Sequence, residues 1–253
     1  NNLDATENIL TFVSEKKIIL TPHEGIRRPF KKIIFNQNKT IMNKNVNFVI
    51  TINRELGSGG RTVGRKLAER LGVQFYDKAV IKGLVEQYHL TPEEIEKLKG
   101  QKQGWWADIK RIMFVSPSMH SNYYIPDKGG EPELLDTDKM FETETEILKG
   151  ISHEESCVIA GRSGFHIFRN HPNHVSILIQ ASQPFRLERV MRKQGISEKD
   201  ALKVIKEVDL MRENYVRKHT GTSRYDTRNY DIVIKADGKT EDEIVDIIMM
   251  YLK

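Results

Sequence analysis

One stretch, residues 48–71, constrains the fold more than any other part of the chain. A β-rich run at 48–52 leads into Gly57-Ser58-Gly59-Gly60, and a helical pattern of apolar residues follows from Arg61. Strand, glycine turn and helix N-terminus form a cradle for phosphate, because glycine lets the backbone N–H groups approach an anion. The stretch therefore favours an α/β fold with a phosphate site, over the alternative of an ordinary glycine-rich turn.

The Walker A pattern, G-x-x-x-x-G-K-[ST], matches this stretch only in part. Gly60, Arg61 and Thr62 fill its last three positions, whereas its first glycine falls on Glu55. Arginine binds phosphate through its planar guanidinium, but it is longer than lysine and not interchangeable with it. Thr62 adds a hydroxyl suited to a phosphate-bound Mg²⁺. We expect the phosphates to bind at Gly57, Ser58, Gly59, Gly60, Arg61 and Thr62.

Length and composition limit the class of protein. The chain has 253 residues, of which 38% are hydrophobic, and a formal net charge of +5. This length fits one α/β domain with insertions, or a domain with an extra segment. The single cysteine, Cys157, excludes an intramolecular disulfide framework and a CxxC zinc site, and its apolar neighbours favour a core position. Because no membrane span or signal peptide stands out, we expect a cytoplasmic protein.

The first 45 residues do not resemble the start of a compact domain. Short apolar pieces alternate there with basic pairs without a sustained period, and the first methionine is Met42. We therefore interpret 1–45 as an N-terminal extension of unknown role and 46–253 as the main domain. The alternative is a peripheral hairpin, in which 17–20 and 32–35 pair as two edge strands.

Further apolar runs alternate with helical patterns along the rest of the chain. Such runs between helices are typical of parallel strands. A helix is expected from Asp136 to about Ile151, and Thr240 is expected to cap the last one. Together with the first run, the pattern predicts strands at 48–52, 73–77, 156–160, 175–181 and 231–236.

Two segments do not follow this alternation of strands and helices. Residues 100–136 hold aromatic side chains among Gly, Pro and Ser, which suits a substrate lobe, a satellite core or the surface of a homodimer. Residues 184–221 read as two helices, the first with arginines three residues apart on one face. These two helices lie between the last two predicted strands of a fold with a phosphate cradle, which suits a mobile lid over polyphosphate. The alternative is a charged helix face that is only solvated. These arginines are Arg186, Arg189 and Arg192.

A second candidate site follows the strand at 156–160, which ends at Gly161-Arg162. In open α/β sheets, ligands bind beyond the carboxyl ends of the strands. Arg162 therefore lies where an anionic substrate would be held. The alternative is a surface ion pair.

With these segments assembled, the chain resembles the cytidylate kinase-like family of P-loop nucleoside monophosphate kinases. The resemblance covers about 46–253 and rests on several linked segments. It implies a P-loop three-layer α/β sandwich: a five-stranded parallel sheet with helices on both faces, a nucleotide-binding insertion at about 78–150 and an arginine lid at about 184–221. The segments are 50–72, 74–78, 157–164, 185–197, 209–221 and 229–234.

The resemblance also implies a reaction, in which ATP·Mg²⁺ phosphorylates CMP or dCMP. Arg61 would take the lysine's place on the ATP phosphates, and Arg162 would bind the acceptor monophosphate. The three lid arginines, Arg186, Arg189 and Arg192, would neutralise the transferred group. Asp77 would open the acceptor lobe, with Lys78 where a small polar residue is usual.

Two further residues, Asp209 and Arg212, would contact ribose and phosphate in the family's R-D-x-x-D-R motif, although Val208 stands where an arginine is expected. Two other functions are open: a kinase of another small acceptor on the same scaffold, and a nucleotide-binding regulatory module without turnover. The unusual Glu55 and Arg61 motivate the second. Binding to nucleic acid is not expected, because scattered basic and aromatic residues do not define a groove with stacking platforms.

Overall fold

The structure is a computed structural model that describes residues 11–12, 42–78, 80, 81, 85, 91, 93 and 137–253. Within this part, one sheet has the strand order β1-β6-β5-β2-β4-β3. The five strands β2 to β6 are parallel to one another, which confirms the predicted sheet. Their bounds are β2 Val49–Arg54, β3 Gln74–Asp77, β4 Cys157–Ala160, β5 His174–Gln180 and β6 Ile232–Lys235.

The sheet departs from the prediction in two places. The two-residue strand β1, Thr11–Phe12, pairs antiparallel with β6 at the edge of the sheet. No sequence pattern predicted a strand there. Strand β2 also runs two residues beyond Ile52, because Asn53 and Arg54 pair with Leu178 and Ile179 of β5. This extension carries β2 to the base of the glycine turn.

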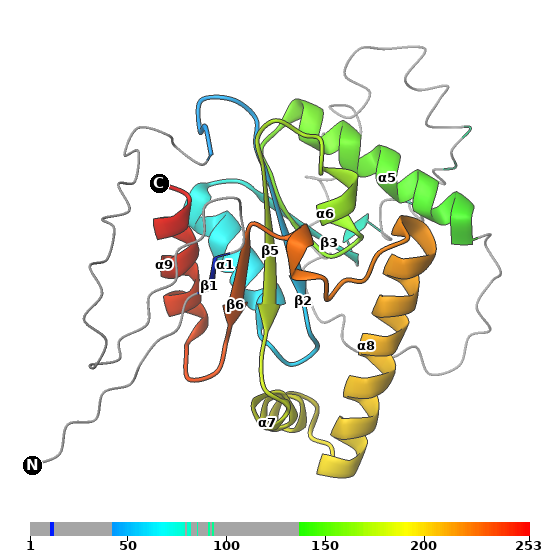
Figure 1. The fold of residues 1–253 in the computed structure, drawn as a ribbon, viewed down its shortest axis with the longest axis vertical. Coiled ribbons are helices and arrows are strands. Elements are labelled where there is room, and N and C mark those ends of the chain that lie inside the picture. Colours follow the sequence, from blue (N-terminus) through cyan, green and yellow to red (C-terminus); the bar gives the residue numbers. More distant parts are fainter. Residues whose placement is uncertain are drawn as a thin grey trace, which may run out of the picture.

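Helices cover both faces of the sheet (Figure 1). Helices α1 and α9 pack on one face, and α5, α6 and α8 pack on the other. Helix α7 lies with α8 beyond the carboxyl end of β5 and shares a small apolar cluster with it. The bounds are α1 Gly60–Leu71, α5 Thr137–Glu154, α6 Gly164–Ile167, α7 Gln183–Gln194, α8 Glu198–Thr220 and α9 Glu241–Tyr251.

The two apolar layers follow from the alternation of side chains along a strand. In β2, Ile50 and Ile52 belong to the core beneath α1 and α9, whereas Val49 belongs to the core beneath α5. All three side chains are fully buried. Cys157 is fully buried in the second core, and burial raises the pKa of its thiol well above the ordinary range. The predicted core position of Cys157 is thus observed.

Side-chain caps begin α8 and α9, and the cap at Thr240 was expected from the sequence. Ser197 caps α8 by accepting a hydrogen bond from the Asp200 N–H. Thr240 begins α9 with a capping box in which Glu243 reaches back to the Thr240 N–H. These local signals explain why the second half of the chain follows its predicted pattern closely.

Several expectations lie outside the described residues: the edge strands at 17–20 and 32–35, the aromatic segment 100–136 and the cap at Asp136. Helix α5 is described from Thr137 and runs to Glu154. Met42 is fully buried in the core beneath α1 and α9. The following loop is held by Asn173, whose amide nitrogen donates to the carbonyl oxygens of Asn43 and Asn47.

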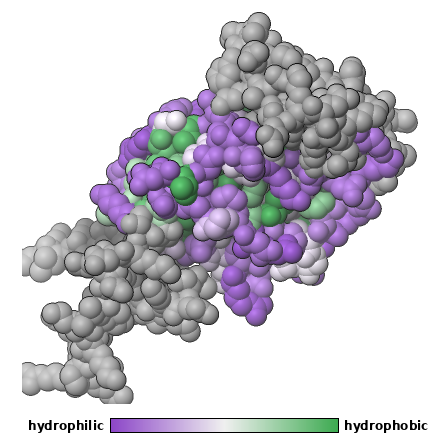
Figure 2. Space-filling model, turned by 90° about the horizontal axis from the view of Figure 1, so that it is seen from above, coloured by the Kyte–Doolittle hydropathy of each residue, from purple (hydrophilic) through white to green (hydrophobic). Residues whose placement is uncertain are grey.

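The face of the molecule in Figure 2 is mostly hydrophilic, with smaller hydrophobic areas between the charged side chains. No helix of the described residues has the length and apolar character needed to cross a membrane.

His174, at the start of β5, predicts a loss of stability in acid. Its Nε2 lies 2.8 Å from the Thr51 hydroxyl, and burial lowers the pKa of the imidazole to about 4. Between pH 6.5 and 4 the unfolded chain binds a proton that the folded chain excludes, so stability falls by about 3 kcal/mol as the pH drops through this window. Urea unfolding at pH 7 and pH 4.5 measures this change. In His174→Gln the loss should be much smaller, whereas the exposed His153→Gln should behave like the wild type.

Candidate phosphate and acceptor sites

The glycine turn lies at the carboxyl end of β2, and two of its residues require glycine. Gly57 has φ 86° and Gly59 has φ 84°, in the left-handed region that L side chains rarely adopt. A Cβ at Gly57 would also lie 2.8 Å from the backbone oxygen of Arg186 on α7. The turn is therefore tightly curved, and α7 packs directly against it.

The first turn of α1 presents backbone donors. The Val63 N–H bonds to the Gly59 carbonyl at 3.1 Å, but among the described residues no acceptor pairs with the N–H groups of Gly60, Arg61 and Thr62. These are the groups that a helix leaves open at its N-terminus. The Arg189 guanidinium adds positive charge, since its Cζ would lie 3.3 Å from a Cβ at Gly59. The arrangement fits an anionic phosphate.

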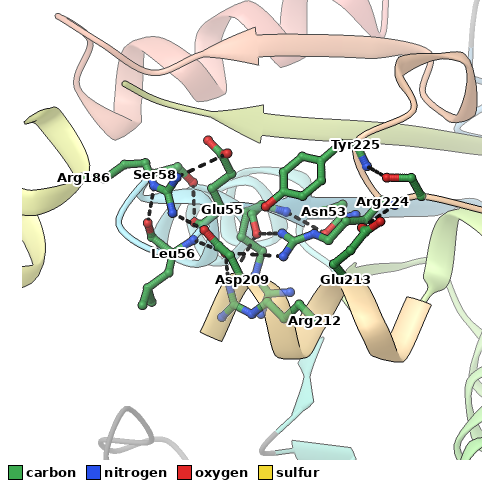
Figure 3. A network of polar contacts seen from close by, with 12 residues as sticks. Asn53, Glu55, Leu56, Ser58, Arg186, Asp209, Arg212, Glu213, Arg224 and Tyr225 are labelled. Atoms are coloured by element: carbon green, nitrogen blue, oxygen red, sulfur yellow. Dashed lines mark hydrogen bonds and ion pairs between the residues drawn. The ribbon is translucent and has the colours of Figure 1, made fainter. Parts of the chain in front are cut away.

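Glu55, which replaces the first Walker A glycine, joins the loop to β5 and α7 (Figure 3). One carboxylate oxygen accepts from the Ala181 N–H at 3.0 Å, and the other lies 3.3 Å from an Arg186 nitrogen. Arg186 Nε also donates to the Leu56 carbonyl at 2.7 Å. Both side chains are nearly buried, so these contacts form a fixed anchor for the loop.

Asp209 on α8 completes this anchor. Its carboxylate accepts from the Leu56 N–H at 3.1 Å and from the Arg186 guanidinium. Arg224, which is fully buried, lies 3.4 Å from the same carboxylate and donates to the carbonyl of Arg54. Figure 3 shows these side chains converging on the end of β2 from α7, α8 and the segment after α8. The loop is therefore held from three sides.

Arg61 and Asp77 form an ion pair. From the sequence, Arg61 was expected to bind the ATP phosphates and Asp77 to open the acceptor lobe. Arg61 Nε donates to Asp77 Oδ2 at 2.5 Å. Asp77, at the end of β3, is buried and also accepts from the Val80 N–H at 3.2 Å, whereas a third of the Arg61 side chain is exposed. The buried carboxylate therefore fixes the direction of the guanidinium beside the phosphate loop.

Arg162 follows β4 in a tight turn, and both Arg162 and Ser163 have left-handed backbones, with φ 54° and 53°. The Arg162 guanidinium forms an ion pair with Glu144 of α5 and lies 5.0 Å from the ring centre of Tyr215 on α8. Burial lowers the pKa of Arg162 below its ordinary value. Arg162 is thus at the predicted end of the sheet, but in a buried ion pair rather than on the surface.

Comparison with known proteins decides the family. The model of the Cytidylate kinase-like family matches residues 49–237, which is most of the chain and contains both candidate sites. The chain belongs to this family. It is accordingly a P-loop kinase, a phosphotransferase, as the resemblance implied. No curated protein matches it.

Solved structures of other proteins are similar to this chain. An uncharacterized protein from Eubacterium ventriosum ATCC 27560 is 26% identical, with a TM-score of 0.57, over 81% of this chain and 98% of that one. A shikimate kinase from Bacteroides thetaiotaomicron is 15% identical, with a TM-score of 0.43, over 81% and 98%. A gluconokinase from Sinorhizobium meliloti 1021 is 14% identical, with a TM-score of 0.41, over 81% and 91%.

In this cytidylate kinase-like chain, the three predicted lid arginines lie in different surroundings. Arg186 is buried in the loop anchor, and Arg189 lies against Gly59 while pairing with Glu241 of α9. Arg192 is exposed on an open groove along α7 that Pro184, Leu187, Met191 and Glu198 also line. Only Arg189 and Arg186 therefore contact the phosphate loop.

Two other predicted residues, Asp209 and Arg212, lie together on α8. Arg212 Nη1 is 3.8 Å from Asp209 and 3.4 Å from the Arg54 carbonyl oxygen. Both side chains face the base of the phosphate loop. Arg224, Glu144 and Tyr215 were not predicted as site residues. Tyr215 lies within the helices expected at 184–221 but was given no role there, and Arg224 and Glu144 lie in segments where no motif marks them.

The residues present fit a nucleotide phosphate, because open helix N–H groups, a glycine turn and Arg189 meet at one point. Thr62 is on the first turn of α1 and half-buried, where a hydroxyl can reach a phosphate-bound cation. Among the described residues, no group of three His, Cys, Asp or Glu side chains is placed to hold a metal ion by itself.

Proposed function

We propose that this chain is a nucleoside monophosphate kinase that transfers a phosphoryl group from ATP·Mg²⁺ to CMP or dCMP. One observation carries the proposal: the phosphate loop follows β2, Arg162 follows β4, and these two parallel strands are neighbours in register. The two anion sites that we propose therefore lie at adjacent strand ends. A kinase that joins two phosphate-bearing substrates needs this arrangement.

The chain's own groups would work by positioning and charge. The N–H groups of Gly60, Arg61 and Thr62, with the Arg189 guanidinium, would hold the donor phosphates. Arg162 would hold the acceptor phosphate. Thr62 would contact Mg²⁺, which supplies charge neutralisation when bound. Phosphoryl transfer depends mainly on such placement and requires no covalent intermediate with the protein.

The loop anchor changes the roles that we propose for three residues. Arg186, Asp209 and Arg212 bind the backbone or side chains of residues 54–56, and two of them are almost fully buried. We propose that they position the phosphate loop rather than contact ribose or the transferred group. Arg189 is then the lid arginine that faces the donor phosphates, and Arg192 would join it only if α7 moved.

A kinase of another small acceptor is the second candidate, and one observation favours it. Glu144 already pairs with the arginine that would receive an acceptor phosphate. A hydroxyl-bearing acceptor without phosphate would leave that pair intact and could donate a hydrogen bond to the carboxylate. The two candidates differ in whether the acceptor carries its own anionic group.

The test is ADP formation from ATP·Mg²⁺ with CMP, dCMP, UMP, AMP and GMP supplied separately. We expect CMP or dCMP to raise the rate at least about tenfold over the rate without acceptor, because only a bound acceptor competes with water for the phosphoryl group. A coupled assay for ADP measures this. Equal, low rates with all five, together with measurable ATP binding, would contradict the proposal and favour the second candidate or a regulatory module.

A further inference from the structure

Glu144 of α5 holds the arginine that the proposed function assigns to the acceptor phosphate. We propose that Glu144 is a specificity-determining residue: its carboxylate occupies the anion position on Arg162, and an acceptor phosphate must displace it to bind. The inference rests on the proposed function in one respect, the assignment of the acceptor anion to Arg162. Glu144 belongs to none of the motifs from which that assignment came.

Burial shows that the pair is built into the fold. The side chain of Glu144 is 2% exposed and that of Arg162 is 9% exposed. A buried charge is tolerated only with a partner, so each group requires the other as long as no ligand is bound. Arg162 Nε is buried and has no hydrogen-bond partner among the described residues. Glu144 therefore leaves one donor of the guanidinium unsatisfied, so a phosphate that replaced the carboxylate could bind the guanidinium with more than one oxygen.

Neighbouring aromatic side chains hold the carboxylate in place. The Tyr215 hydroxyl donates to Glu144 Oε2 at 2.8 Å, and the Tyr215 ring lies beneath the guanidinium. His219, on the next turn of α8, lies edge-on to Tyr215, with 4.7 Å between the ring centres. It also stacks on Phe141 of α5, with 4.3 Å between the ring centres. Glu144 is thus fixed by contacts between α5 and α8, and not only by Arg162.

Chemistry limits what can share this position. A guanidinium binds a carboxylate or a phosphate in the same planar geometry, and two anions on one buried guanidinium repel each other. An acceptor phosphate must therefore break the Glu144 contact, and a weakly anionic or neutral ligand has no means to do so. Once displaced, the carboxylate can accept a hydrogen bond from an N–H or O–H of the acceptor. Glu144 would so keep ligands that lack a strongly charged group from binding Arg162.

The test compares Glu144→Gln with wild type by calorimetric titration of CMP and, separately, of inorganic phosphate. Glutamine keeps the shape and removes the charge, so we expect both probes to bind about ten times more tightly. Glu142→Gln is the matched control, because Glu142 lies on the same helix and is exposed; it should bind both probes like the wild type. The gain should disappear in the double variant Glu144→Gln/Arg162→Lys, which separates this site from phosphate bound at the loop.

A second variant covers the case in which Glu144→Gln does not fold. Tyr215→Phe removes the hydroxyl that donates to the carboxylate and that also contacts the Arg162 guanidinium, and should tighten phosphate binding about two- to threefold. Tighter binding of phosphate without any binding of CMP would support the role of Glu144 and refute CMP as the acceptor. Unchanged or weaker phosphate binding in the variant that folds would overturn the inference, whatever the result with CMP.

Discussion

Replacing Asp209 by alanine is expected to lower the free energy of unfolding by about 3–5 kcal/mol, the cost of breaking a buried ion pair by removing one partner. Asp209 accepts from the Leu56 N–H and pairs with two buried arginines, Arg186 and Arg224. Alanine leaves both positive charges close together without their shared carboxylate. Urea unfolding of the two proteins at pH 7 measures the difference.

The control is Glu207→Ala, two residues earlier on α8. Glu207 is exposed and lies 3.9 Å from Lys203, so its loss should cost less than about 1 kcal/mol. Asp209→Ala also removes the acceptor of the Leu56 N–H, so it should loosen the phosphate loop as well as destabilise the fold. Equal unfolding energies for Asp209→Ala and Glu207→Ala would show that the anchor does not stabilise the fold.

Replacing Arg61 by alanine is expected to reduce kcat/KM for ATP by about 10²- to 10³-fold, the usual cost of losing one donor that faces developing charge. Arg61 stands in the lysine position of the phosphate loop, and Asp77 holds its guanidinium at 2.5 Å. Initial rates of ADP formation at varied ATP measure the effect. Arg65→Ala, on the exposed face of α1, should stay within about twofold of the wild type.

Asp77→Asn shows whether the direction of Arg61 matters. This variant keeps the guanidinium but weakens its fixed partner, so we expect a smaller loss than in Arg61→Ala. If Arg61→Ala turned over ATP normally, the open N–H groups and Arg189 would be sufficient, and Arg61 would serve only to neutralise the buried Asp77.

The parallel sheet could be predicted because each of its strands is a short apolar run between helices. The cap at Thr240 is equally local, so it too was visible. The strand at Thr11–Phe12 was not, because two residues carry no period, and its pairing depends on the distant edge of β6. The predictable helices and strands thus follow from local patterns, whereas the strand at Thr11–Phe12 follows from long-range pairing.

The site was predictable in its positions but not in its pairings. Glycine spacing located the phosphate loop, and the end of β4 located Arg162. Helical spacing could not show that Arg186 would meet Asp209, which lies 23 residues further along the chain, or that Arg162 would meet Glu144. Such pairs depend on how separate elements pack. The residue type alone does not show whether a charged side chain faces water or a buried partner.

The phosphate loop is held by side chains that a glycine motif does not include, and this affects how such loops can be recognised in sequences. Glu55 carries the bonds to Ala181 and Arg186, so a glycine at this position would remove both contacts. Substitutions at 55, 186 and 209 should therefore have non-additive effects, as residues of one network do. A motif search that insists on the first glycine would pass over every loop that is held in this way.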